Sequence, residues 1–159
     1  MLVPLATANS HDDLCVDVLP AEAEAVLQKQ FPALYPEKVS DLSAEYRDAW
    51  ISKHPQECPG IAVGHFLSAG VASYAVLLIG SKGGLSGSTL VVASKSGKSA
   101  WKLTKVSEEK VAYHYEAVIK VPASTSSGGL QRIQLKELDG GASNFYWSGG
   151  RFHRVAVRE

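Results

Sequence analysis

The sequence predicts an α+β fold dominated by β-structure, with two helices followed by a mostly antiparallel sheet or sandwich of about seven to eight strands. Two observations lead to this prediction. Apolar residues recur at helical spacing in the first third of the chain. From Gly60 onward, short apolar segments alternate with Gly- and Ser-rich turns, which is typical of antiparallel strands. We therefore expect a tether over residues 1–18 and a single domain over residues 19–159.

The two helices are expected over residues 20–31 and about 41–52. Pro20 suits the first turn of a helix, acidic residues follow it, and Pro32 stops the helix. A link bounded by prolines connects the two helices. The apolar faces consist of Ala23, Val26, Leu27 and Phe31 in the first helix, and of Leu42, Tyr46, Ala49 and Trp50 in the second.

The strands are expected at residues 61–66, 73–79, 88–93, 100–106, 111–120, 130–138, 144–147 and 151–157. The last two are separated only by Ser148-Gly149-Gly150, which is the clearest hairpin signal in the chain. The Ser- and Gly-rich residues 122–129 are expected to form an exposed loop.

Composition excludes several classes of protein. The 16 basic residues are balanced by 16 acidic ones, so no basic excess favours nucleic acid. The hydrophobic fraction of 45% argues against disorder. No apolar run reaches the roughly 18 residues of a membrane span.

Two cysteines, Cys15 and Cys58, lie in polar segments and lack the spacing of a zinc site. This position favours a disulfide in an oxidising compartment, with two buried free thiols as the alternative. The apolar residues 1–8 look like the end of a secretory signal, or else are simply an apolar start. We expect a periplasmic or secreted protein.

No catalytic motif is complete. Gly97-Lys98-Ser99 lacks the earlier glycine of a phosphate loop, because Val92 occupies that position. The five histidines are scattered and show no metal-ligand spacing. We expect that the protein is not an enzyme and binds no cofactor or metal. The remaining enzymatic alternative is a small hydrolase that uses Ser86 as its nucleophile.

Residues 58–78 resemble the FG-GAP family of integrin-type calcium loops. The matching residues are Gly64, Phe66, Gly70, Tyr74, Ala75 and Val76. The family's calcium ligands would fall at His65, Leu67, Ala69 and Ser73, where no carboxylate is present. The resemblance therefore implies a strand, a loop and a strand without calcium, as in a structural or adhesion-type module.

Residues 83–89 are expected to form a tight turn between two strands. Ser86, Gly87 and Thr89 resemble the Ser-Gly-x-(Tyr/Thr) loop of bacterial periplasmic lysozyme inhibitors, although the usual tyrosine is absent at Thr89. The resemblance implies that hydroxyl groups of this loop bond to the catalytic carboxylates of a target enzyme.

The last hairpin is expected to place Phe145 and Trp147 on one face and Tyr146 on the other. One face belongs to the core, and the other is a candidate aromatic and basic binding patch. We therefore expect an exported binding protein, most concretely an inhibitor or immunity protein against a peptidoglycan hydrolase or toxin. The expected contact residues are Gly84, Ser86, Gly87, Ser88, Thr89, Tyr146 and Arg151.

Overall fold

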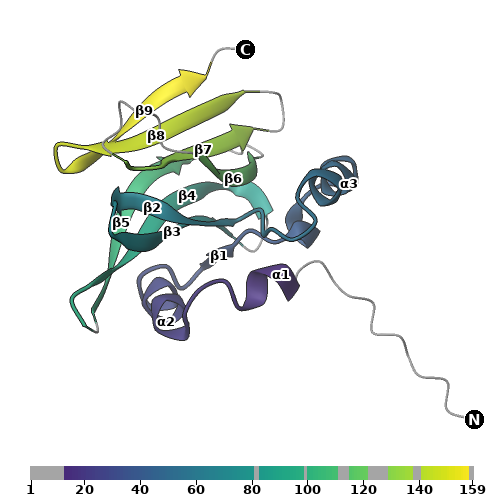
Figure 1. The fold of residues 1–159 in the computed structure, drawn as a ribbon. Coiled ribbons are helices and arrows are strands. Elements are labelled where there is room, and N and C mark those ends of the chain that lie inside the picture. Colours follow the sequence, from purple (N-terminus) through teal and green to yellow (C-terminus); the bar gives the residue numbers. More distant parts are fainter. Residues whose placement is uncertain are drawn as a thin grey trace, which may run out of the picture.

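The protein folds into three layers (Figure 1). This computed structural model describes residues 13–80, 83–98, 100–110, 115–121, 129–137 and 141–157. Helices α1 and α2 cover one face of a first sheet, and a second sheet covers its other face. The elements in chain order are α1 (Asp13–Val16), α2 (Ala21–Gln30), β1 (Leu34–Pro36), the 3₁₀ helix η1 (Val39–Asp41), α3 (Ala44–Lys53), β2 (Ile61–Ser68), β3 (Val71–Gly80), β4 (Gly83–Ser96), β5 (Ala100–Glu109), β6 (Tyr115–Val121), β7 (Arg132–Glu137), β8 (Ala142–Ser148) and β9 (Arg151–Val157).

The first sheet is built around β3 and β4, which pair with each other, and β5 lies beyond β4. Both central strands are covered on two faces, which explains their continuous apolar runs. Leu77 and Leu90 pack toward the second sheet, whereas Val76, Leu78 and Val91 pack toward the helices. Alternating side chains of one strand thus belong to two different cores.

The outer edge of β3 has two partners in turn. Its first half pairs with β2, and its end, residues 78–80, pairs with β1. The change occurs at Leu77, whose N–H donates to Gly60 O at 2.8 Å and whose carbonyl accepts from Glu37 N at 3.0 Å. A Cβ at Gly60 would overlap the Glu37 carbonyl, so only glycine allows the two segments to come this close.

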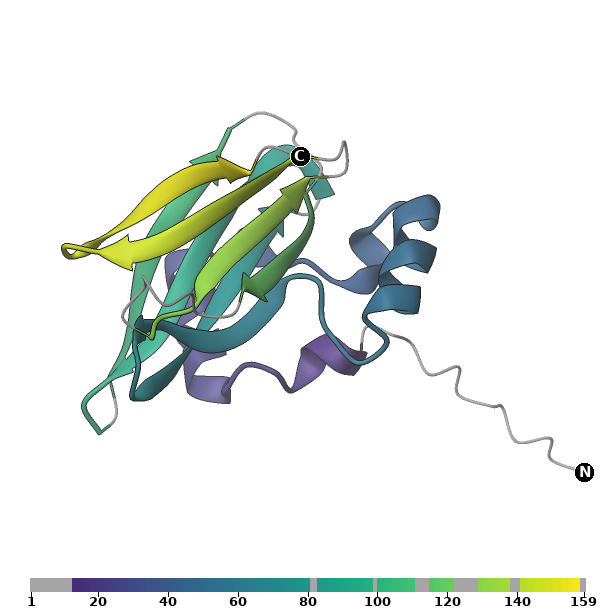
Figure 2. The same cartoon turned by 45° about the horizontal axis from the view of Figure 1, so that its top comes forward.

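The second sheet is an antiparallel meander in the order β6-β7-β8-β9 (Figure 2). Ile133, Leu135 and Phe145 fill the space between the two sheets together with Phe66, which is fully buried. Polar contacts also connect the two sheets: His65 N–H of β2 donates to Oε1 of Gln131, just before β7, at 2.8 Å. Arg154 of β9 forms a salt bridge with Glu109 at the end of β5, with a nitrogen–oxygen distance of 3.3 Å.

The predicted α+β class, its dominant β-structure and its antiparallel pairing are confirmed. The described residues contain three α-helices and nine strands. Eight of the strands, β2–β9, follow the helices as predicted, whereas one helix and one strand were not predicted. The extra elements are α1, within the segment expected to be a tether, and β1, within the proline-bounded link. The second predicted helix, about residues 41–52, starts only at Ala44, because Asp41 at its expected start is the last residue of η1.

The predicted disulfide between Cys15 and Cys58 is confirmed, and the alternative of two free thiols is wrong. Their Cα atoms are 5.0 Å apart, and the bridge ties α1 to the segment just before β2. Cys58 is buried among Leu19, Leu27 and Ile61, on the helix-covered face of the first sheet. In the described part of the chain, no helix is long and apolar enough to cross a bilayer.

Candidate functional site

The segment predicted as a tight turn, residues 83–89, lies in strand β4 instead. The prediction was wrong because a Gly- and Ser-rich composition is typical of turns, whereas here pairing of Gly83, Ser88 and Thr89 holds both ends of the segment in the sheet. Gly83 pairs with Gly80 and Ser88 pairs with Ile79, so the backbone between Gly83 and Ser88 bulges out of the ladder with β3.

Ser88 and Thr89 of this segment are not exposed at a loop tip. Ser88 and Thr89 are 6% and 7% exposed and are opposite Glu109 and Glu108 of β5. Together with Gly87 and neighbouring residues, they line a polar hollow of about 340 Å³. The side chain of Ser86 lies outside the described residues. Ser88 and Thr89 therefore cannot enter an enzyme cleft without leaving the sheet.

Gly87 has φ +94°, and a Cβ there would overlap the Glu109 carbonyl. We expect Gly87→Ala to lower the free energy of unfolding by about 1 to 3 kcal/mol, because a side chain is strained at this φ and would push β5 away. Urea unfolding of both proteins measures this difference, with Gly97→Ala as a control, since Gly97 also has a positive φ but has open space around it. Equal losses in the two variants would show that the close contact with Glu109 adds nothing.

The predicted aromatic and basic patch is present on the outward face of the second sheet. Phe145 is buried in the core, and Trp147 packs edge-on against Phe152, with ring centroids 5.0 Å apart. Tyr146 and Arg151 belong to the opposite face because side chains alternate along a strand. The structure thus separates the predicted contact residues: Ser88 and Thr89 are buried in the first sheet, and Tyr146 and Arg151 lie on the outside of the second.

Three side chains form a row across this outward face. Arg132, Tyr146 and His153 belong to β7, β8 and β9. Tyr146 pairs with His153, and Arg132 directly precedes Ile133, which pairs with Phe145. The rings of Tyr146 and His153 stack with centroids 5.1 Å apart, and the Arg132 guanidinium carbon is 5.5 Å from the Tyr146 centroid. His153 Nε2–H donates to Ser148 O at 2.9 Å. Arg132 and His153 come from the two strands that flank β8, so the Tyr146 ring has a partner from each neighbouring strand.

We call this surface the outer face, and its described charged side chains are basic. Its described side chains include Arg132, Lys136 and Arg151, and they include no Asp or Glu. Beside the row, Gln134 Nε2 donates to Asn144 Oδ1 at 3.2 Å. The side chains of the outer face are Arg132, Gln134, Lys136, Ala142, Asn144, Tyr146, Ser148, Arg151, His153, Val155 and Val157. Arg132 was missed in the sequence because its position beside Tyr146 depends on the β7–β8 register.

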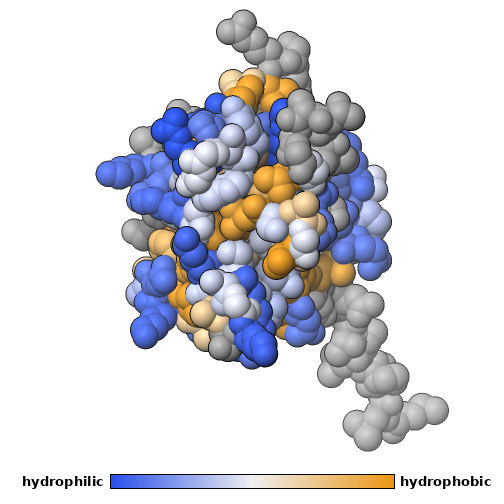
Figure 3. Space-filling view, turned by 60° about the vertical axis from the view of Figure 1, so that its left-hand side comes forward, coloured by the Kyte–Doolittle hydropathy of each residue, from blue (hydrophilic) through white to orange (hydrophobic). Residues whose placement is uncertain are grey.

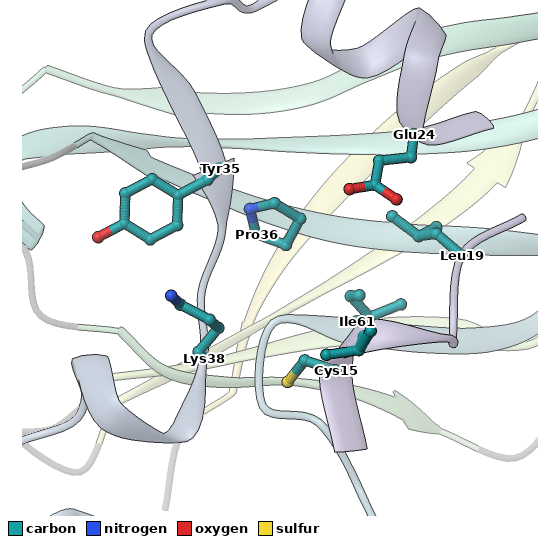
Figure 4. Close-up of a pocket in the computed structure, with 8 residues that line it drawn as sticks. Cys15, Leu19, Glu24, Tyr35, Pro36, Lys38 and Ile61 are labelled. Atoms are coloured by element: carbon teal, nitrogen blue, oxygen red, sulfur yellow. The ribbon is translucent and has the colours of Figure 1, made fainter. Parts of the chain in front are cut away.

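A second candidate site is a hollow of about 310 Å³ beside the disulfide (Figure 4). We call it the disulfide pocket. Its walls come from segments that are distant in the sequence, namely the α1 region, α2, β1 and the start of β2. The lining residues are Cys15, Val16, Leu19, Glu24, Tyr35, Pro36, Lys38 and Ile61. Of these residues, only Cys15 was expected to have a special role, as half of a disulfide. No local sequence pattern connects the segments that form the pocket.

Exposed apolar side chains are few, and two of them lie at the candidate sites. Val16, at the disulfide pocket, is 63% exposed, and Val155, on the outer face, is 45% exposed. Val63 and Val71, on the β2–β3 hairpin, are the other large apolar residues exposed in the described part of the chain. Figure 3 shows apolar surface bordered by hydrophilic residues on the left-hand side of the molecule in Figure 1.

A buried acidic residue follows β1. Glu37 is 6% exposed, and its Oε2 atom has no hydrogen-bond partner. Burial raises the pKa of this carboxyl well above its usual value, and the nearby Asp41 carboxylate raises it further. Asp41 accepts hydrogen bonds from Lys38 N–H at 2.8 Å and Tyr35 O–H at 3.1 Å. Burial, together with this bond to Asp41, also raises the pKa of Tyr35.

Comparison of the chain with protein families, with curated proteins and with solved structures found no match. Within the described ranges, no three His, Cys, Asp or Glu side chains are grouped as a metal site would require. The arrangement of the outer face and of the disulfide pocket is therefore the basis for a functional proposal.

Proposed function

We propose that the chain is an exported, non-enzymatic binding protein that uses its outer face to bind an acidic surface of another protein. The observation that carries this proposal is the row of Arg132, Tyr146 and His153 on a rigid antiparallel sheet. Tyr and Arg are enriched among the residues that dominate binding energy in protein interfaces. Side chains already held in place lose little entropy on binding.

The geometry favours a protein partner over a sugar. A sugar ring would need an open aromatic face, but the Tyr146 ring already stacks with His153 and lies beside the Arg132 guanidinium. The planar guanidinium groups of Arg132 and Arg151 instead suit carboxylates, which they can bind with two hydrogen bonds. The Cys15–Cys58 bridge supports export, since disulfides persist in oxidising compartments.

In its most concrete form, the protein inhibits an enzyme that cleaves the cell wall, or gives immunity to such a toxin. Glycoside hydrolases commonly use a pair of Asp or Glu residues in their cleft. The basic side chains of the outer face complement such a cleft, whereas the buried Ser88 and Thr89 do not reach it. The inhibitory contact is thus assigned to the outer face rather than to residues 83–89.

The decisive experiment compares variants in binding to one identified partner. The purified protein is used to capture secreted and envelope proteins, and the dissociation constant of the recovered partner is then measured. We expect Arg151→Glu and Tyr146→Ala each to weaken binding by about tenfold or more, because each removes a central contact. Lys95→Glu, at the exposed end of β4, reverses one positive charge just as Arg151→Glu does. This control should leave the dissociation constant unchanged. Unchanged affinity in both outer-face variants would exclude this surface.

A structural module similar to FG-GAP repeats is the second candidate function. It is favoured by the β2–β3 hairpin, where the buried Ser73 hydroxyl donates to Gly64 O at 3.2 Å and accepts from Phe66 N–H at 3.4 Å. These bonds cross-link the hairpin without an ion. Capture of no enzyme or toxin, but only of structural envelope proteins, would favour this candidate over an inhibitor.

A further inference from the structure

We propose that the disulfide pocket binds short apolar peptides with free amino and carboxyl ends. This inference does not depend on the outer face, since the pocket is formed by the N-terminal segments, β1 and the start of β2. Its volume of about 310 Å³ lies at the lower end of the range for small-molecule sites. A ligand of a few residues is therefore the right size.

The pocket has a fixed apolar wall. Leu19 and Ile61 are 7% and 6% exposed and belong to the core on the helix side of the first sheet. The disulfide fixes Cys15, and pairing with β3 fixes β1. Val16 at the pocket remains exposed, so an apolar side chain of a ligand would remove it from water.

Two oppositely charged side chains flank this wall. Figure 4 shows the Glu24 carboxylate and the Lys38 ammonium on opposite sides of the pocket. Lys38 Nζ lies 5.3 Å from the centre of the Tyr35 ring. Among the described residues, neither Glu24 nor Lys38 takes part in a salt bridge.

These charges select the ligand. A peptide with free ends places its carboxylate at Lys38 and its ammonium at Glu24, with apolar side chains against Leu19 and Ile61. Each end then forms a charge-assisted hydrogen bond, the stronger kind in proteins. A fatty acid would satisfy Lys38 only, and its apolar tail would lie against the charged Glu24. The charge pattern therefore favours a dipolar ligand.

Calorimetric titration of the oxidised protein with Leu-Leu and Leu-Leu-Leu tests this inference. We expect one peptide per protein, with affinity about tenfold lower when the peptide is N-acetylated or C-amidated, because each change removes one charged contact. Decanoate, with a carboxylate but no ammonium, should bind more weakly than the peptides. Absence of binding at millimolar peptide, or equal binding of the blocked peptides, would overturn the proposal.

Variants of the protein give the second arm of the test. Lys38→Met and Glu24→Gln should each weaken binding of the free peptide about tenfold. Lys38→Met should also abolish the difference between free and amidated peptide, which a mere loss of packing would not do. Lys29→Met and Glu22→Gln alter exposed residues of α2 that do not line the pocket, and they should bind like the parent. Binding that is insensitive to Lys38→Met and Glu24→Gln would place the peptide elsewhere.

Discussion

Removal of the Cys15–Cys58 bridge is expected to lower the free energy of unfolding by about 4 kcal/mol. The bridge joins residues separated by 43 positions, and a loop of this length gives that value when the cross-link restricts the unfolded chain. The loss should be large because a domain of this kind is stabilised by only about 5 to 15 kcal/mol. It should also loosen α1, since the bridge ties this short helix to the body of the domain.

Denaturant unfolding of the oxidised protein, the reduced protein and the Cys15→Ala/Cys58→Ala variant measures this loss. The reduced protein and the variant should unfold at similar, lower denaturant concentrations. Reductant should not change the unfolding of the double variant, which controls for effects of the reagent. If reduction left the midpoint of the parent unchanged, the bridge would contribute nothing to its stability.

The free energy of unfolding is also expected to fall as pH rises above about 4.5, because the buried Glu37 carboxyl has a raised pKa in the folded protein. Its folded-state pKa is raised, so the folded protein retains a proton that the unfolded chain releases at lower pH. The contribution is complete below the ordinary value of 4.5 and is lost as pH rises toward the raised value. Within that window each pH unit costs about 1.4 kcal/mol. Above it, the carboxylate is charged and buried beside Asp41.

The variant Glu37→Gln should remove this part of the pH dependence. Glutamine has the same shape but carries no charge, so at neutral pH the variant should be more stable than the parent. Thermal unfolding across a series of pH values shows both effects. Glu45→Gln, on the exposed side of α3, is the matched control and should follow the parent curve. Parallel curves for Glu37→Gln and the parent would refute the assignment.

Local patterns were sufficient where one strand determines its own environment. The apolar runs of β3 and β4 predicted strands, and the alternation of Phe145, Tyr146 and Trp147 predicted a core face and an outward face. Strand β1 could not be predicted, because its three residues include Pro36 and are held by pairing with the end of β3. Residues 83–89 were misread because their composition is that of a turn.

The candidate sites depend on contacts between distant segments, and this limits what a single sequence predicts. Tyr146 and Arg151 follow from alternation along one hairpin, but Arg132 joins them only through the register of β7 and β8. The disulfide pocket needs α2, β1 and β2 together. Its charged residues, Glu24 and Lys38, look like ordinary solvated residues in the sequence.

The change of partner at Leu77 has a consequence for truncation and proteolysis. The N-terminal third of the chain is not a detachable arm, because β1 completes the edge of β3 that β2 leaves uncovered. A fragment starting at β2 would present unpaired backbone groups at residues 78–80 and an uncovered apolar face with Val76, Leu78 and Val91. Such an edge beside such a face is a template for strand-to-strand aggregation. A protease cut in this segment, followed by its loss, would thus produce an insoluble remnant instead of a smaller working domain.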